Sequence, residues 1–307
     1  MTIEIISADL LIPYQINQDN QLEPATLVVD DLKKSFPPSQ LRRLTRIDKL
    51  FLKSVYRLLA PHRNVVSDLS QLNYLITTSY GELQGNLKYM KLLNSDTVSP
   101  TTFIQTISNS IMGNVAMLME FRGNCVAFSC SNVIGMAIAS MTDDEVYIVS
   151  GGDEKQVEIK NFAHVNEGTS SLLLRKTSKP SPDAIRIDWN QSISNPKQKI
   201  NRLDKLFTEM VSSRLLLILL NDKVIKSYVF EKCQQKGITP LDLSEFVGTY
   251  YGGNSIIATS LAYKLLTNNW QMDGVTFSST LILITNEKSG PLIMTQLSKG
   301  ASLNEEK

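Results

Sequence analysis

The sequence predicts a layered α/β fold in which one domain spans all 307 residues. Short apolar segments typical of buried strands alternate with longer stretches whose apolar residues recur every three or four positions, as in helices. A polar connection that contains prolines, at 176–183, divides the chain into a first half of about residues 1–175 and a second of about 176–300. The second half repeats the alternation in a shorter form. We therefore expect a duplicated core whose second copy is reduced.

The first half is expected to begin with a strand that carries Ile3 and Ile5 and is either an edge strand or the first strand of a sheet. A helix follows over 39–59, with Ser39 as its N-cap and Pro61 as its stop. The other elements expected in this half are, in order, a strand at 72–79, a helix from Gly81, an apolar helix at 103–119, a strand at 125–129, a helix at 131–139, and strands at 146–150 and 169–174.

The second half is expected to contain one strand that is apolar throughout, Leu215–Leu220, which suits burial on both faces of a sheet. The polar residues after Leu297 are expected to fray. The other elements expected here are, in order, a strand at 184–189, a long loop ending near Lys199, helices at 202–212 and 224–236, a short segment around Phe246, a turn at 252–254, a helix at 256–266, and a hairpin of 276–285 with 291–297.

Charge and composition exclude several classes of function. Lys and Arg total 31 and Asp and Glu total 30, so the chain lacks the basic excess with which proteins hold a nucleic-acid backbone. The longest apolar run has six residues, whereas a membrane-spanning helix needs about 20. The N-terminus has no basic segment of the secretory type, and the three cysteines lack metal-ligand spacing. We expect a cytoplasmic protein that binds neither nucleic acid nor a metal and does not span a membrane.

Several segments of the first half occur in an order that resembles a known family. They are Arg42-Arg43-Leu44, Thr78-Ser79-Tyr80-Gly81-Glu82, and Ser99-Pro100-Thr101-Thr102-Phe103 followed by Ser108-Asn109. The chain resembles short β-ketoacyl-synthase-like proteins, which have the thiolase fold and occur with aryl-polyene-type and related type II polyketide systems. The corresponding family pattern is Arg-Arg-x-Ser, Ser-x-x-Gly-Glu, and Ser-Pro-Thr-x-Phe followed by His-Asn.

Three later segments agree with ketosynthases in general: Gly151–Glu154, Asn166–Thr169 and Gly252–Ser255. The resemblance covers most of the chain, from residue 40 to residue 285. It implies a thiolase-like fold of duplicated, layered α/β halves. It also implies that acyl chains arrive on the phosphopantetheine of an acyl carrier protein and that no other cofactor is bound.

The catalytic residues of the family are only partly present. A decarboxylative condensing enzyme needs a Cys nucleophile at the start of a helix and two polar groups, commonly imidazoles, that stabilise the enolate. Cys130 lies near the expected nucleophile position, but neither His62 nor His164 matches a family histidine, and the His-Asn pair is Ser108-Asn109 here. No His-Gly-Thr-Gly-Thr segment occurs. The resemblance therefore implies a ketosynthase fold without the usual acid–base groups.

Each candidate residue also has a structural interpretation. Cys130 is either an acyl-carrying nucleophile or a small buried residue at a tight turn. Asn254 is either a hydrogen-bond donor to a thioester or enolate oxygen or the residue that a turn requires after two glycines. Cys125 and Cys233 are expected to be structural, in a strand and in a helix, and both histidines are expected to be structural or exposed.

The main hypothesis is a non-catalytic subunit of the chain-length-factor type that forms a heterodimer with an active β-ketoacyl synthase. The uncharged strand at 125–129 would pair with its counterpart in the partner, because an uncovered edge strand promotes aggregation. The helix at 103–119 would line the acyl tunnel and the interface, so Met112→Trp would shorten the products. The residues assigned to tunnel and interface are Phe103, Ile107, Ser108, Asn109, Met112 and Phe128.

A basic helix edge offers a second contact surface. It consists of Arg42, Arg43 and Arg46 with Lys49 and Lys53. This edge is either an ordinary solvated face or a dock for an acidic acyl carrier protein and the phosphate of its prosthetic arm. The resemblance favours the three arginines as docking residues.

Two other functions stay open at this point. The chain could be an acyl-transferring or condensing enzyme in which Cys130 is the nucleophile and Asn254 and Ser108 replace the histidines. It could instead be a stand-alone acyl-binding or scaffold protein, in which case it would be well behaved when expressed alone.

Overall fold

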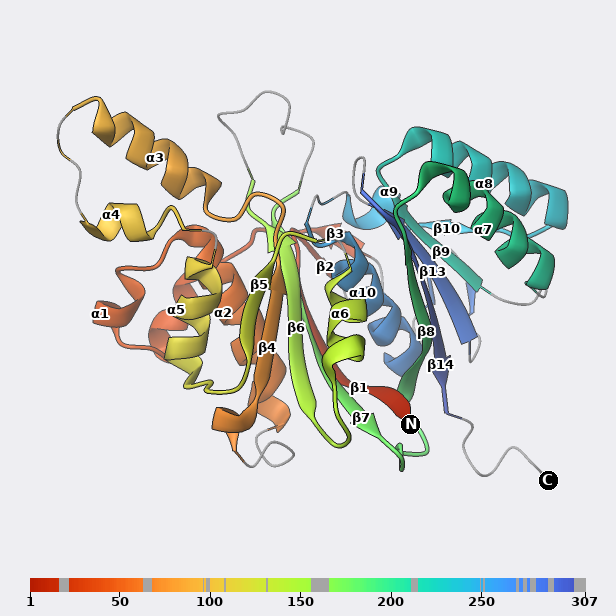
Figure 1. Ribbon diagram of the computed structural model, residues 1–307, viewed down its shortest axis with the longest axis horizontal. Coiled ribbons are helices and arrows are strands. Elements are labelled where there is room, and N and C mark those ends of the chain that lie inside the picture. The colour runs from red at the N-terminus through yellow and green to blue at the C-terminus, as the bar shows by residue number, and fades with distance from the viewer. Residues whose placement is uncertain are drawn as a thin grey trace.

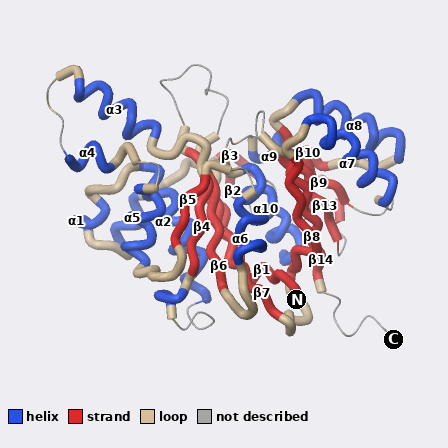
Figure 2. The backbone as a smooth tube through the Cα atoms, viewed as in Figure 1, coloured by secondary structure: helices blue, strands red, loops and turns tan. Residues whose placement is uncertain are grey.

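The computed structural model describes residues 1–16, 22–62, 68–95, 97, 100–107, 109–130, 132–155, 166–210, 215–248, 250, 252–268, 271–272, 275–276, 280–286 and 290–300. Strands from both halves form one ten-stranded sheet, and helices lie on both of its faces (Figure 1). The strand order is β10-β9-β13-β14-β8-β1-β7-β6-β4-β5. The sheet curves so that its two halves face each other across a central pair of helices (Figure 2).

The strands of this sheet are β1 (Thr2–Leu11), β4 (Asn73–Thr77), β5 (Cys125–Phe128), β6 (Val146–Asp153), β7 (Gly168–Thr177), β8 (Ile185–Ile193), β9 (Leu215–Leu220), β10 (Leu241–Asp242), β13 (Thr280–Asn286) and β14 (Leu292–Lys299). Two small hairpins lie outside it. They pair β2 (Tyr14–Ile16) with β3 (Leu22–Pro24) and β11 (Gln271–Met272) with β12 (Val275–Thr276).

The helices are α1 (Pro38–Leu41), α2 (Arg46–Leu59), α3 (Leu83–Leu93), α4 (Pro100–Ile104), α5 (Ser110–Met119), α6 (Val133–Ser140), α7 (Pro196–Glu209), α8 (Lys223–Lys236), α9 (Leu243–Val247) and α10 (Asn254–Asn268). Short 3-10 turns occur at Asp30–Lys34, Ala60–His62 and Leu69–Gln71. Within the described ranges, no helix is long and apolar enough to cross a lipid bilayer.

The two halves of the sheet have the same topology. In the first half β1 is antiparallel to β7, β7 is antiparallel to β6, and β6, β4 and β5 are parallel. In the second half β8, β14, β13, β9 and β10 repeat this arrangement in the same sequence of orientations. Antiparallel pairing of β1 with β8 joins the halves. The duplicated core expected from the sequence is confirmed, and its second copy is the shorter one.

Both faces of each half-sheet are buried, which gives five layers. Leu172 and Leu174 of β7 point into the central layer with α6 and α10, whereas Leu173 between them packs on the outer face with α2 and α5. In β9 the alternation is the same: Leu217 and Leu219 are central, and their neighbours pack under α7 and α8. Burial of alternate residues on opposite faces explains why these strands are apolar throughout.

Two elements expected as single helices are divided in the structure. Residues 39–59 form α1 and α2, and the N-cap of α2 is Thr45, not Ser39. The Thr45 side chain accepts from the amide of Asp48 (3.2 Å) while the Asp48 carboxylate accepts from the amide of Thr45 (2.8 Å), which is a reciprocal capping box. Residues 103–119 are divided between α4 and α5 by a turn in which the amide (2.9 Å) and the hydroxyl (2.7 Å) of Thr106 both donate to the carbonyl of Phe103.

Two other expectations differ from the structure, and a third is confirmed. The opening strand is not at an edge, since β1 lies between β7 and β8 in the interior of the sheet. The long loop expected before Lys199 is largely ordered as β8 and the first turn of α7. The expected strand at 125–129, in contrast, is β5, and it forms one edge of the sheet as predicted.

We expect Thr45→Ala to lower the free energy of unfolding by about 1–2 kcal/mol, because it removes the helix cap and its link to Glu82. Ser39→Ala is the matched control. Ser39 is exposed within α1, so its loss should change stability by less than about 0.5 kcal/mol. Urea unfolding of both variants measures the difference, and equal effects would show that Thr45 is not the effective cap.

Candidate functional site

The candidate site lies where the parallel strands of the first half end. Strands β4, β5 and β6 are parallel, so their carboxyl ends meet at the same border of the sheet, where ligand sites of open α/β sheets commonly form. Asp153, the last residue of β6, ties the loops of this border together. Its Oδ1 accepts from the hydroxyl of Thr78 (2.7 Å) and the amide of Ser79 (3.0 Å), and its Oδ2 accepts from the amide of Gly252.

Burial raises the pKa of Asp153, while these hydrogen bonds lower it. The contacts place the loop after β4 and the loop before α10 against each other. Gly252 permits this approach because a Cβ at that position would lie 2.2 Å from the amide nitrogen of Ser79. Asp153 was not among the residues predicted for the site, although its place in the Gly151–Glu154 segment could have suggested it.

Asn254 lies at the start of α10, and its side chain is held by the protein. Its Oδ1 accepts from the amide of Tyr250 (2.9 Å), and its Nδ2 donates to the carbonyl of Asn286 at the end of β13 (2.8 Å). The residue is 1% exposed. Its backbone is not in the left-handed region: among described non-glycine residues only Glu120 and Asp144 have positive φ. The observed role of Asn254 is therefore to bind two loops to the helix, not to form a positive-φ turn.

Cys130 follows β5 and precedes α6, whose N-cap is Asn132. The carbonyl of Cys130 accepts a hydrogen bond from the hydroxyl of Thr77 at the end of β4. The Cys130 side chain is partly buried against the central core, and the residue borders a groove of about 660 Å³. The described residues that line this groove are neutral, and they are Ser129, Cys130, Asn132, Gly135, Met136, Asn190, Ser192, Ser194, Gly290 and Pro291.

Two asparagines fix the start of α6 against the second half of the chain. Asn132 accepts from the amide of Gly135 (3.1 Å) and donates to Asn190 of β8 (2.8 Å), and Asn190 donates to Thr295 of β14 (2.8 Å). This chain of hydrogen bonds runs from the start of α6 to two strands of the second half-sheet, beside Cys130. It can position the helix start and offer polar contacts to a ligand, but amides cannot move protons as an imidazole does.

The two histidines do not complete a catalytic group at this groove within the described residues. His62 belongs to the turn after α2, at the end of the helix opposite to Thr45, and burial lowers its pKa. His164 lies outside the residues that the structure describes, as does Ser108. Cys125 is partly buried on β5, and Cys233 is buried on α8, where burial raises its pKa to about 11.

A buried pair of carboxyl groups lies behind the loop that follows β4. Glu82 is 1% exposed, and its Oε1 accepts from the hydroxyls of Thr45 (3.2 Å) and Ser110 (3.3 Å). Asp48, at the start of α2, interacts electrostatically with Glu82, and it accepts from Asn114 of α5 (3.1 Å). Burial, reinforced by the negative charge of Asp48, raises the pKa of Glu82 to about 9. Glu82 is therefore protonated at neutral pH and joins α2, α5 and the loop.

The predicted docking arginines have different environments. Arg42 and Arg43 are exposed between α1 and α2. Arg46 pairs through two nitrogens with Glu167, one contact being 2.8 Å, and this raises its pKa. Lys53 is largely buried, with an ion pair to Asp31 (2.7 Å). The solvated part of the basic edge is thus its N-terminal end.

The residues predicted for the tunnel and interface are also separated. Phe103 and Ile107 lie outside α5 and are 52% and 42% exposed, and the Phe103 ring contacts that of Tyr89 at 5.8 Å between centroids. Asn109 is exposed at the start of α5. Met112 packs partly buried against the core under α2, and Phe128 packs partly buried against the central core.

Comparison with known proteins agrees with this geometry. Residues 16–140 match a protein family described as the N-terminal domain of β-ketoacyl synthase. No match was found among curated proteins. The fold of the whole chain is the thiolase-like fold of ketosynthases, as the sequence predicted.

Three solved structures illustrate the likeness. The type II ketosynthase assembly AntDE:AntF, with its acyl carrier protein, has a TM-score of 0.71 at 12% identity, covering 97% of this chain and 99% of that one. The ishigamide ketosynthase/chain length factor has a TM-score of 0.67 at 11% identity, with coverage of 97% and 99%. The ketosynthase ApeO with its chain length factor ApeC, from Xenorhabdus doucetiae, has a TM-score of 0.67 at 13% identity, with coverage of 97% and 98%.

We expect Glu82→Gln to reduce the loss of stability that the protein suffers as the pH rises from about 5 to 9. The pKa of Glu82 is about 9 in the folded chain against an ordinary value of 4.5, so the folded state retains a proton that the unfolded state has released. Stability contributed by this proton is complete below pH 4.5 and is lost as the pH rises toward 9, by at most about 1.4 kcal/mol per pH unit.

Glutamine keeps a donor toward Asp48 and does not ionise, so the variant should show a flatter dependence. Urea unfolding at pH 5, 7 and 9 measures it. Glu209→Gln is the control, because the Glu209 side chain is 65% exposed. Parallel curves for wild type and Glu82→Gln would contradict the raised pKa of Glu82.

Proposed function

We propose that this chain is a ketosynthase-like subunit that does not itself condense acyl groups, and that it pairs through strand β5 with a catalytically active ketosynthase. The observation that carries the proposal is the open edge of β5, the last strand of the sheet on this side. Solved structures with this fold include a ketosynthase with its chain length factor, which supports pairing between related chains.

The backbone of β5 offers hydrogen bonds to a partner. The amide of Tyr74 in β4 donates to the carbonyl of Asn124 (2.9 Å), and Tyr74 is in register with Cys125. In a parallel pair, the polar groups of alternate residues point to the same neighbour, so Asn124 and Val126 face β4. The amides and carbonyls of Cys125 and Ala127 consequently face the open edge, where they are available to another strand.

Apolar side chains gather on the elements around this edge. We define the edge surface as seven exposed hydrophobic residues. They lie on α3, on α4 and the turn after it, on α5 and on β5, and they are Met90, Leu93, Phe103, Ile104, Ile107, Met117 and Val126. In Figure 1, α3, α4 and α5 lie on the left of the molecule, and β5 lies nearer its centre. An uncovered, uncharged strand beside such a surface favours association, and a partner that covers both would remove the exposure.

The lack of acid–base groups at the groove supports a non-catalytic role. Decarboxylative condensation requires groups that stabilise an enolate and manage protons, and the described lining of the Cys130 groove consists of hydroxyls, amides, apolar groups and one thiol. Asn254, the expected substitute, uses its amide to hold Tyr250 and Asn286. The subunit would therefore act by stabilising its partner and shaping the partner's acyl tunnel.

We expect Ala127→Pro to abolish co-purification with the partner ketosynthase while leaving the isolated fold intact. Proline removes an amide that faces the open edge, and it spares the ladder to β4 because that ladder uses Val126. Ala127→Val, which keeps the amide, is the matched control. The measurement is the yield of complex from co-expression with a tagged ketosynthase, with circular dichroism of the variant alone.

Undiminished complex with Ala127→Pro would contradict pairing through β5. A wild-type chain that is monomeric and soluble when expressed alone, and that binds no ketosynthase, would instead favour a scaffold protein.

A second function, an acyl-transferring enzyme, is favoured by the place of Cys130 between β5 and α6 at the border of a groove. The two proposals differ in one variant. As a helper subunit, the assembled pair should retain turnover within about twofold after Cys130→Ala, whereas an enzyme that uses this thiol would lose orders of magnitude. Mass spectrometry after incubation with an acyl thioester gives the complementary result, since only the enzyme forms a covalent adduct on Cys130.

The carrier protein and the acyl chain follow from the same proposal. One solved structure with this fold is bound to an acyl carrier protein, which supports a carrier as the second partner. On this chain the exposed Arg42 and Arg43 are the docking residues that we propose, since Arg46 is occupied by Glu167. Met112 is the member of α5 that we propose as nearest to a tunnel, because it is only partly buried.

A further inference from the structure

The outer face of the second half-sheet carries a row of cross-strand pairs beneath α7. Trp189 of β8 is opposite Gln296 of β14, Gln191 is opposite Met294, and Ile193 is opposite Leu292. Ile193, Leu292 and Met294 belong to the hydrophobic core of this side, against which Trp189 packs partly buried. The row is therefore apolar and buried at the Ile193–Leu292 end and accessible to solvent at the Trp189 end.

The corresponding face of the first half is closed by α2. Helix α2 bonds to the sheet through Arg57 with Asp9 of β1 (3.1 Å), and Ser54 with Ser171 of β7 (2.9 Å). Helix α7 occupies the equivalent place in the second half, because both helices follow the first strand of their half. Lys199 of α7 donates to the carbonyl of Gly290, just before β14 (2.7 Å), and Leu206 of α7 packs in the hydrophobic core on this face of the sheet.

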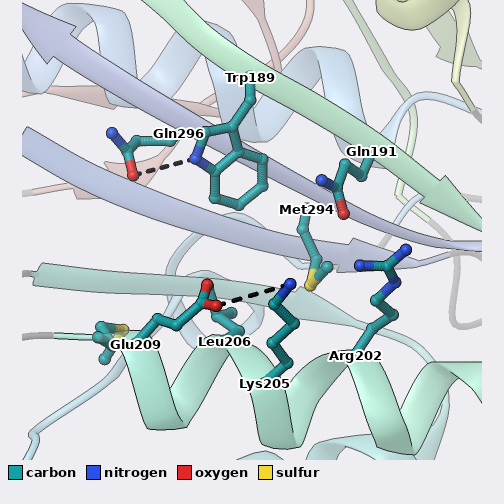
Figure 3. A pocket seen from close by; sticks show the side chains of 9 residues that line it. Trp189, Gln191, Arg202, Lys205, Leu206, Glu209, Met294 and Gln296 are labelled. Atoms are coloured by element: carbon teal, nitrogen blue, oxygen red, sulfur yellow. Dashed lines mark hydrogen bonds and ion pairs between the residues drawn. The ribbon is translucent and has the colours of Figure 1, made fainter.

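The space left between α7 and the sheet is a cavity of about 310 Å³ (Figure 3). This volume lies at the lower end of the range for small-molecule sites. The floor is apolar, formed by the Trp189 ring with Met294, Leu206 and Met210. The Trp189 ring is held in place, because its Nε1 donates to Gln296 (3.1 Å) and Gln296 donates to Asp188 (2.8 Å).

One wall of the cavity is cationic. Arg202 and Lys205 of α7 both line it, together with Glu209. Lys205 pairs with Glu209 at 3.6 Å, whereas Arg202 has no acidic partner among the residues that the structure describes. In Figure 3 the guanidinium of Arg202 lies on the same side of the cavity as the amide of Gln191. Together they offer several N–H donors and one uncompensated positive charge beside a flat aromatic floor.

We propose that this cavity binds a small organic anion with a flat apolar body. The ring of the ligand would stack on Trp189 and contact Met294, and its carboxylate would accept hydrogen bonds from Arg202 and Gln191. A single anionic group matches the net charge of the lining, where Lys205 and Glu209 cancel. The site lies on β8, β14 and α7, on the face of β8 opposite to Asn190 and Ser192 of the Cys130 groove and far from β5 in the strand order, so it is independent of the proposed pairing through β5.

The experiment uses the full chain and three probes: 2-naphthoate, the uncharged 2-naphthylmethanol, and inorganic phosphate. The chain contains two tryptophans, so Trp270→Phe leaves Trp189 as the single indole, and its N–H cross-peak in a proton–nitrogen NMR spectrum reports on the cavity. We expect the Trp189 cross-peak to shift saturably with 2-naphthoate. Both the alcohol and phosphate should bind at least about tenfold more weakly, because the alcohol lacks the negative charge and phosphate lacks the aromatic ring.

Arg202→Gln should weaken the binding of 2-naphthoate by about tenfold and leave the binding of the alcohol unchanged. The substitution removes a charge-assisted hydrogen bond but leaves the apolar floor in place. Lys223→Gln, an exposed cation on α8 outside the cavity, is the control and should change neither. The proposal is overturned if the Trp189 signal does not shift at millimolar 2-naphthoate. It is equally overturned if acid and alcohol bind alike, or if Arg202→Gln and Lys223→Gln behave the same.

Discussion

The structure depends on one constraint: α10 must be buried between the two half-sheets over most of its length, with α6 packed beside it. Ile256, Ile257 and Leu261 of α10 are fully buried, as are Val133 and Ile134 of α6. A helix buried all round has no polar face to position it, so its ends must be fixed by specific contacts. Those contacts are Asn132 at the start of α6, and Asn254 and the Gly252 loop at the start of α10.

The candidate site is a result of this constraint. Both central helices begin at the border where the parallel strands of the first half end, so the residues that fix them form the surroundings of Cys130. Asp153 and the Asn132–Asn190–Thr295 chain are largely buried polar groups, and each is satisfied by hydrogen bonds that cross between elements. The same polar groups that could serve a ligand are thus used to hold the scaffold, which suits a subunit that supports a reaction more than one that performs it.

Much of the fold could be predicted from local patterns. The strand Leu215–Leu220 was predicted with its observed bounds, and the helix at 224–236 differs from α8 by one residue, because aliphatic runs and the 3.6-residue period are local signals. The helix at 39–59 was wrong at its start, although the Thr45–Asp48 spacing is a capping signal that could have located α2. The break between α4 and α5 is not marked by a glycine or a proline between Ile104 and Ser110, so local signals could not locate it.

The candidate site was predictable in position but not in its contacts. The resemblance singled out the Cys130 and Gly252 segments, and the structure shows how they are held. The bonds of Glu82 to Thr45 and Ser110, of Arg46 to Glu167 and of Asn254 to Asn286 join residues between 28 and 121 positions apart in the chain, so composition and spacing could not identify them. Most of those bonds determine whether a polar side chain is held inside the protein or is available to a ligand. A functional assignment depends on that distinction.

The open edge at β5 has a consequence for how the protein is produced. A newly made chain without a partner exposes the unpaired edge of β5, and two such chains can pair with each other through it. A cell that makes this chain in excess of whatever covers the strand would accumulate aggregates. Under the proposed pairing, matched synthesis of this chain and its partner would prevent such aggregates.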